Sequence, residues 1–165
     1  MLECCGCGTG SLKHQSLFSE ERGIKTIYYP PRIARSLPEW RWTLPQQIGD
    51  ILIEVYAALQ ADCRTLALMG ARAIMDLVIL DKVGDVGTFA QKLEELEIQG
   101  FVGTQNRLFL AAALDAGNAA THRGYTPESE DIKHVMDIIE NLLQAVYALE
   151  RAAQKLKRST PPRTR

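Results

Sequence analysis

The sequence has almost no net charge, few cysteines and no long apolar run. Its 19 lysine and arginine residues balance 20 aspartate and glutamate residues, and the net charge of -1 excludes a generally basic nucleic-acid coat. The longest apolar run, Leu108 to Leu114, is far below the roughly 18 residues that span a bilayer. The first residues lack both a basic and an apolar region, so we expect no signal peptide, no membrane association and a cytoplasmic location.

The few cysteines argue against a secreted disulfide framework, because three crowd at the N-terminus and only Cys63 lies elsewhere. Cys4 and Cys7 have the spacing with which two thiolates bind one tetrahedral zinc ion. This is half a site, and Cys5, His14, Cys63 or a second subunit would have to complete it. Reduced thiols without a cofactor are therefore the favoured interpretation, and zinc is the alternative.

The chain has 165 residues, of which 46% are hydrophobic. This length and hydrophobic content are enough for one compact domain. Prolines and scattered glycine and serine indicate an irregular N-terminal arm over residues 1–42, in which Thr26 to Tyr29 could form one short strand. Residues 43–157 have a helical pattern, and residues 158–165 form a basic, frayed tail. The sequence therefore predicts an all-α fold, an antiparallel bundle of about five helices behind an irregular arm.

Local signals place the ends of these helices. Thr88 and Gln91 match a capping box, and Thr43, Thr104 and Thr126 are candidate caps of the first, fourth and fifth helices. The second helix is apolar on most sides, so we expect it to be central in the bundle. The expected helices cover about residues 43–62, 64–82, 88–99, 104–122 and 126–157.

The last helix carries an apolar stripe with alternating spacings of four and three residues. Such a stripe occurs in a bundle core or in the seam of a coiled coil. Further apolar residues widen it, so packing within the bundle is favoured over a seam for a partner. The stripe consists of Val135, Ile139, Leu142, Val146, Leu149, Ala153 and Leu156.

The end of the fourth helix holds the candidate catalytic residues. Asn118 and His122 are four residues apart and share a helix face, and Arg123 adds a guanidinium that matches a phosphate. Gly117, beside them, costs a helix about 1 kcal/mol relative to alanine and so predicts a close packing contact. In the alternative interpretation, Asn118 and His122 form a satisfied polar pair that closes the helix, and Arg123 is solvated. The residues alone slightly favour this alternative.

Residues 117–122, with the sequence GNAATH, resemble the GN-x-A-A-H element of the family called domain of unknown function 4145. This family is a branch of the HEPN (higher eukaryotes and prokaryotes nucleotide-binding) superfamily. The resemblance extends over nearly the whole chain in order and spacing. Its other elements are residues 29–31 (YPP), 38–40 (PEW), 53–58 (IEVYAA) and 70–76 (GARAIMD).

The resemblance implies a HEPN-like helical bundle that often works as a dimer in defence, toxin-antitoxin or RNA-processing settings. It also implies that catalytic members cleave RNA without metal, using a histidine and an arginine four to six residues before it. Here Asp115, Ala116 and Gly117 lie seven, six and five residues before His122, so that arginine is missing and a carboxylate stands nearby. We therefore expect, at most, a degenerate metal-independent ribonuclease.

Four further residues are candidates for binding. Arg72 could replace the missing arginine in space, although Asp76 one turn later would equally hold it in an ion pair. Trp40 and Trp42 could stack a base, but a lid over the bundle is the favoured interpretation. Tyr125, at the end of the candidate segment, completes this set.

Two functions remain open at this point. One is an RNA- or nucleotide-associated module of a bacterial or phage-related defence or toxin-antitoxin system, with weak or no ribonuclease activity. The other is a noncatalytic interaction or scaffolding subunit that binds a protein partner. Both include a homodimer, whose interface we expect near Asn118, His122 and Arg123.

Overall fold

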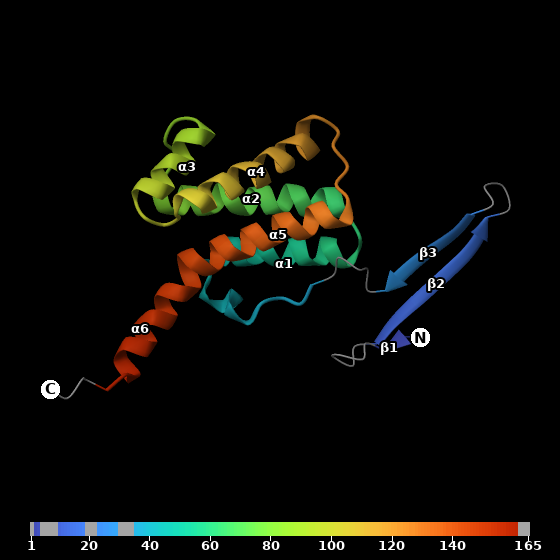
Figure 1. The fold of residues 1–165 in the computed structure, drawn as a ribbon, viewed down its shortest axis with the longest axis horizontal. Coiled ribbons are helices and arrows are strands. Elements are labelled where there is room, and N and C mark those ends of the chain that lie inside the picture. Colours follow the sequence, from blue (N-terminus) through green and yellow to red (C-terminus); the bar gives the residue numbers. More distant parts are fainter. Residues whose placement is uncertain (1, 4–9, 19–22, 30–34, 162–165) are drawn as a thin grey trace.

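The computed structural model describes residues 2–3, 10–18, 23–29 and 35–161, and their helices form a bundle (Figure 1). The all-α fold class is confirmed. The helices are α1 (Gln46–Gln60), α2 (Arg64–Val83), α3 (Phe89–Ile98), α4 (Thr104–His122), α5 (Ser129–Leu143) and α6 (Leu149–Ser159). A short 3-10 helix η1 (Glu39–Thr43) precedes α1, and a π-helical turn η2 (Gln144–Ala148) joins α5 to α6.

The N-terminal arm is more regular than the sequence indicated. Strands β2 (Gly10–Phe18) and β3 (Gly23–Tyr29) pair antiparallel, with Leu12 opposite Tyr29, and β1 (Leu2–Glu3) pairs with the start of β2. The strand expected at Thr26 to Tyr29 is thus the second half of β3. Strand β2 was missed because its mainly polar sequence has no clear alternation, and its pairing partner, β3, is a separate stretch of the chain.

Helix α2 lies at the centre of the bundle, as expected. It packs against α1, α3, α4 and α5, and its apolar residues are buried on several sides because helices surround it. Leu68, Ile74 and Met75 of α2 are almost fully buried among core residues of α1, α4 and α5.

The capping box that begins α3 is confirmed, whereas three other caps were wrong. The Thr88 N–H donates to Gln91 Oε1 over 2.7 Å, and the Gln91 N–H donates to Thr88 Oγ1 over 3.5 Å. At α1, α4 and α5 the N-cap positions are held by Pro45, Gly103 and Glu128.

The three threonines lie outside those cap positions for local reasons. The Thr43 hydroxyl donates to the Trp40 carbonyl over 2.7 Å, which closes η1. Thr104 is already inside α4, and its hydroxyl donates to Glu97. Thr126 lies two residues too early, because Glu128 forms the capping box of α5.

The last predicted helix divides into a buried and an exposed part. The stripe is buried as far as Val146, so core packing is correct to that point. In α6 no residue is buried, and Leu149 and Leu156 are 53% and 66% exposed. Helix α6 extends beyond the bundle (Figure 1), where none of the other described helices runs beside it. Core packing was therefore the wrong expectation for residues 149–156.

Within the described residues, no helix combines the length and apolar character needed to cross a membrane.

Candidate functional site

The candidate catalytic residues lie in the last turns of α4. Asn118 is half-buried and His122 is exposed. Neither side chain makes a hydrogen bond to any residue within the part of the chain that the structure describes. The satisfied Asn118–His122 pair is therefore not formed, and neither side chain has a hydrogen-bond partner among the described residues.

Arg123 is paired with Asp115 while its side chain stays exposed. Its Nη2 donates to Asp115 Oδ1 over 2.7 Å and to the Asp115 carbonyl over 2.9 Å. The two side chains are 56% and 73% exposed, and an ion pair this exposed contributes at most about 1 kcal/mol to stability. Asp115 thus neutralises Arg123 in the protein alone, although the pair is weak enough to open.

Arg72 lies where α2 crosses α4, and it explains Gly117. A Cβ atom on Gly117 would come within 2.8 Å of Arg72 Cβ, so only glycine lets the two helices approach this closely. The expected packing reason for Gly117 is confirmed. The packing partner is the side-chain stem of Arg72.

The charged end of Arg72 points away from His122. Its Nη1 lies 3.2 Å from Asp76 Oδ2, and its guanidinium lies 5.6 Å from the centre of the Phe89 ring. Because α2 and α4 run in opposite directions (Figure 1), the side toward Asp76 leads to the start of α4, whereas His122 ends it. The ion pair with Asp76 was the alternative that the sequence left open. Desolvation by burial raises the pKa of Asp76 despite the opposing effect of Arg72.

Tyr125 stabilises the start of α5. Its hydroxyl donates to Asp131 Oδ2 over 2.6 Å, and the same oxygen accepts the Glu128 N–H over 2.9 Å. The hydrogen bond from Tyr125, followed by that from Glu128, lowers the pKa of Asp131. The Tyr125 N–H donates to the Ala119 carbonyl over 3.1 Å, so this structural contact also closes α4 beside the candidate site.

The two tryptophans lie at the other end of α5. Trp40 packs against the bundle core, which confirms the lid interpretation for this residue. Trp42 is 76% exposed, and the Arg41 guanidinium lies 4.1 Å from the centre of its ring, so the lid interpretation is wrong there. Both belong to η1, which packs against η2. The structure therefore does not bring them together with His122.

The zinc hypothesis cannot be placed in the fold, because Cys4 and Cys7 lie outside the described residues. Among the residues that are described, no group of three or more histidine, cysteine, aspartate or glutamate side chains could hold a metal ion. Cys63 is exposed and His14 lies on β2. Zinc binding stays a prediction.

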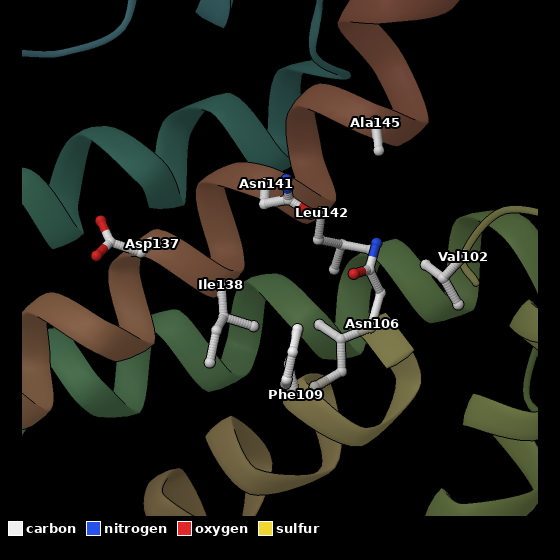
Figure 2. A pocket seen from close by; sticks show the side chains of 9 residues that line it. Val102, Asn106, Phe109, Asp137, Ile138, Asn141, Leu142 and Ala145 are labelled. Carbon is white, nitrogen blue, oxygen red and sulfur yellow. The ribbon is translucent and has the colours of Figure 1, made fainter. Parts of the chain in front are cut away.

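A groove between α4 and α5 was not expected from the sequence (Figure 2). It has a volume of about 230 Å³, a mainly apolar wall and two carboxamides, those of Asn106 and Asn141. Asp137 lies at one end (Figure 2) and pairs with Arg35, which precedes η1 in the sequence. Asn106 and Asn141 come from different helices, so no local pattern could show that they meet. The groove is lined by Val102, Asn106, Phe109, Leu110, Asp137, Ile138, Asn141, Leu142 and Ala145.

The turn η2 is anchored to the end of α2. The Tyr147 hydroxyl donates to Asp81 Oδ2 over 2.7 Å, and Lys82 Nζ lies 4.5 Å from the centre of the Tyr147 ring. Burial, together with the bond to Asp81, raises the pKa of Tyr147 far above its usual value. This contact fixes the point from which α6 departs.

Comparison with known proteins identifies the family. The family described as domain of unknown function (DUF4145) matches residues 53–159, which is more than half of the chain. The chain belongs to this family. The DUF4145 match begins within α1 and continues to Ser159, the last residue of α6, so it includes α6 as well as the bundle. No curated protein and no solved structure matches the chain.

Proposed function

We propose that this DUF4145 protein is a noncatalytic interaction subunit built on a HEPN-like bundle. The observation that carries this proposal is that Arg72 and Arg123, the two arginines that could serve the motif, are both paired with carboxylates. Arg123 is held by Asp115, and Arg72 is held by Asp76 on the side away from His122. RNA cleavage by His122 would need a positioned cation to stabilise the charge that builds on the phosphate. Arg72 and Arg123 are both engaged by carboxylates instead.

The family resemblance supports a bacterial or phage-related defence or toxin-antitoxin setting for this subunit, in the cytoplasm and without a cofactor. In that setting the protein would hold a protein partner or a second copy of itself. The exposed apolar face of α6 supports such a role, because exposed contiguous apolar surface commonly marks an interaction site.

One observation favours a second candidate, an RNA- or nucleotide-associated module with weak ribonuclease activity. Asn118 and His122 are free of hydrogen bonds to the described residues. The exposed Arg123–Asp115 pair could open to let Arg123 contact a phosphate. In that candidate Arg123 would bind the phosphate while His122 transfers a proton.

Cleavage and binding of single-stranded RNA separate the two candidates. We expect the wild type and the variants His122→Ala and Asp115→Arg to show neither. His134→Ala is the matched control, because His134 is another exposed histidine, on α5.

Cleavage by the wild type that falls roughly 100-fold in His122→Ala and stays unchanged in His134→Ala would replace the proposal by the ribonuclease. Binding that appears or strengthens in Asp115→Arg, without cleavage, would favour the RNA-associated module. That substitution frees Arg123, removes a carboxylate and adds a donor for phosphate.

A further inference from the structure

The groove between α4 and α5 contains two carboxamide side chains without a partner in the described part of the chain. Asn106 on α4 is half-buried and Asn141 on α5 is exposed (Figure 2), and neither side chain makes a hydrogen bond to a described residue. A carboxamide offers two N–H donors and one acceptor oxygen. The groove therefore combines a mainly apolar wall with polar groups from both helices that are available to a ligand.

The size of the groove favours one side chain of a partner over a whole small molecule. Its volume is about 230 Å³, whereas sites for small molecules usually measure about 300–1,000 Å³. Leu110 and Leu142 line it and are buried, and Phe109 lines it and is 47% exposed. A single large apolar side chain would fill this space and cover Phe109, as anchor residues do at protein interfaces.

The charge of the groove argues against an anionic ligand. Among the lining residues that the structure describes none is basic, and Asp137 is acidic. Asp137 shares Arg35 with Glu140, so one guanidinium serves two carboxylates. The Asp137 side chain is 64% exposed and can accept a further hydrogen bond. A phosphate or an acidic segment is disfavoured at this end, and a lysine or arginine is favoured.

The carboxamides indicate that the partner segment is extended and not helical. The backbone N–H and C=O groups of a helix bond to one another, whereas those of an extended segment are free to bond to a carboxamide. Side chains two positions apart in an extended segment point to the same side and lie about 7 Å apart. Five residues of α5 separate Asp137 from Leu142, which is also about 7 Å along a helix axis.

We propose that the α4–α5 groove binds an extended segment of a partner protein that carries a large apolar residue and, two positions away, a lysine or arginine. The apolar side chain enters between Phe109 and Leu142, and the cation pairs with Asp137. The carboxamides of Asn106 and Asn141 bond to the backbone of the segment. This inference rests on the proposed role as an interaction subunit, and it names the surface and the kind of partner. A single anchor gives weak binding, with a Kd of about 0.1–1 mM.

The first experiment titrates the isotope-labelled full chain with capped tetrapeptides and follows its amide signals by NMR. The probe is acetyl-Gly-Trp-Gly-Arg-amide, whose caps remove the terminal charges. We expect saturable shifts of the side-chain signals of Asn106 and Asn141 and of the backbone signal of Phe109. Replacing the tryptophan of the probe by alanine should abolish these shifts. Replacing its arginine by glutamate should weaken binding by about 5-fold or more.

The second experiment repeats the titration with variants of the groove. Asn106→Ala and Asn141→Ala should each weaken binding of the probe by about 5-fold, since each removes hydrogen bonds to its backbone. Gln144→Ala is the matched control, because Gln144 is an exposed carboxamide next to Ala145 that does not line the groove. Asp137→Asn should remove the preference for the arginine probe over the glutamate probe.

A chain that shows no saturable shift with up to about 10 mM probe would overturn the proposal, as would equal effects of the asparagine and control substitutions. Indole that binds as tightly as the peptide would replace the protein segment by a small molecule. Thermal unfolding checks each variant, and Asn141→Ala, at an exposed position, carries the test if Asn106→Ala is destabilised. These titrations contain no RNA, so failure here and failure of the proposed function are separately visible.

Discussion

For Gly117, sequence and structure predict opposite effects of an alanine substitution on stability. By helix propensity alone, replacing it with alanine should stabilise α4. The structure reverses the sign, because the added Cβ would lie 2.8 Å from Arg72 Cβ and 3.1 Å from Arg72 Cδ. Arg72 forms an ion pair with Asp76, so moving Arg72 aside would disturb that ion pair.

We therefore expect Gly117→Ala to lower the free energy of unfolding by about 1–3 kcal/mol, as overpacked core substitutions do. Urea denaturation measures this change. Gly49→Ala is the control, because Gly49 is inside α1 with no atom within 4 Å of an added Cβ. It should stabilise the protein by about 0.5–1 kcal/mol. Equal effects of the two substitutions would contradict the close α2–α4 crossing.

At the scale of the element, the start of α5 depends on a charge. Asp131 accepts hydrogen bonds from Tyr125 and from the Glu128 N–H, and these bonds lower its pKa. A carboxyl whose pKa is lower in the folded state stabilises that state while it is ionised. Its contribution is therefore complete above its unfolded pKa of about 3.9 and is lost as the pH falls through the folded value.

We expect Asp131→Ala to lower the free energy of unfolding at neutral pH by about 1 kcal/mol, the usual effect of losing a helix N-terminal cap. The difference from the wild type should shrink below about pH 4, as the wild-type carboxyl becomes protonated. Thermal unfolding followed by circular dichroism across this range measures it. Asp131→Asn retains an acceptor oxygen without the charge, so its stability should depend less on pH than that of the wild type. A pH-independent difference would argue against the ionised cap.

At the scale of the whole molecule, the chain separates into a bundle that holds itself together and a helix that does not contribute to it. Val146 and Tyr147 are 6% and 8% exposed, whereas every residue of α6 is exposed. The Tyr147–Asp81 hydrogen bond marks the boundary between these parts. Stability of the bundle and association of the protein should therefore be separable.

A chain that ends at Leu149 should keep its free energy of unfolding within about 1 kcal/mol of the full chain at concentrations where both are monomeric, because exposed residues contribute little. A chain that ends at Gln144 should lose about 3 kcal/mol or more, since it lacks the buried Val146 and Tyr147. Urea denaturation and sedimentation of the two truncated chains provide the comparison. Strong destabilisation of the longer one would mean that α6 packs on its own bundle.

Much of the helical architecture could be predicted from the sequence, because apolar periodicity and capping chemistry are local. The limits of α2 and α4 and the capping box at Thr88 and Gln91 depend on residues within a few positions of one another. The same locality identified Asn118 and His122 as one helix face, and the order of short motifs identified the DUF4145 family.

Only the tertiary structure decided which of these residues meet. Arg72 could have faced His122 or Asp76, and the packing of α2 against α4 selected Asp76. Asn106 and Asn141 share a groove only because α4 and α5 are neighbours. The apolar stripe is regular through residue 156, yet burial ends with η2, because α6 has no packing contacts with the described helices of the bundle. A periodic pattern predicts that one helix face is apolar, and only the contacts between distant segments determine what covers that face.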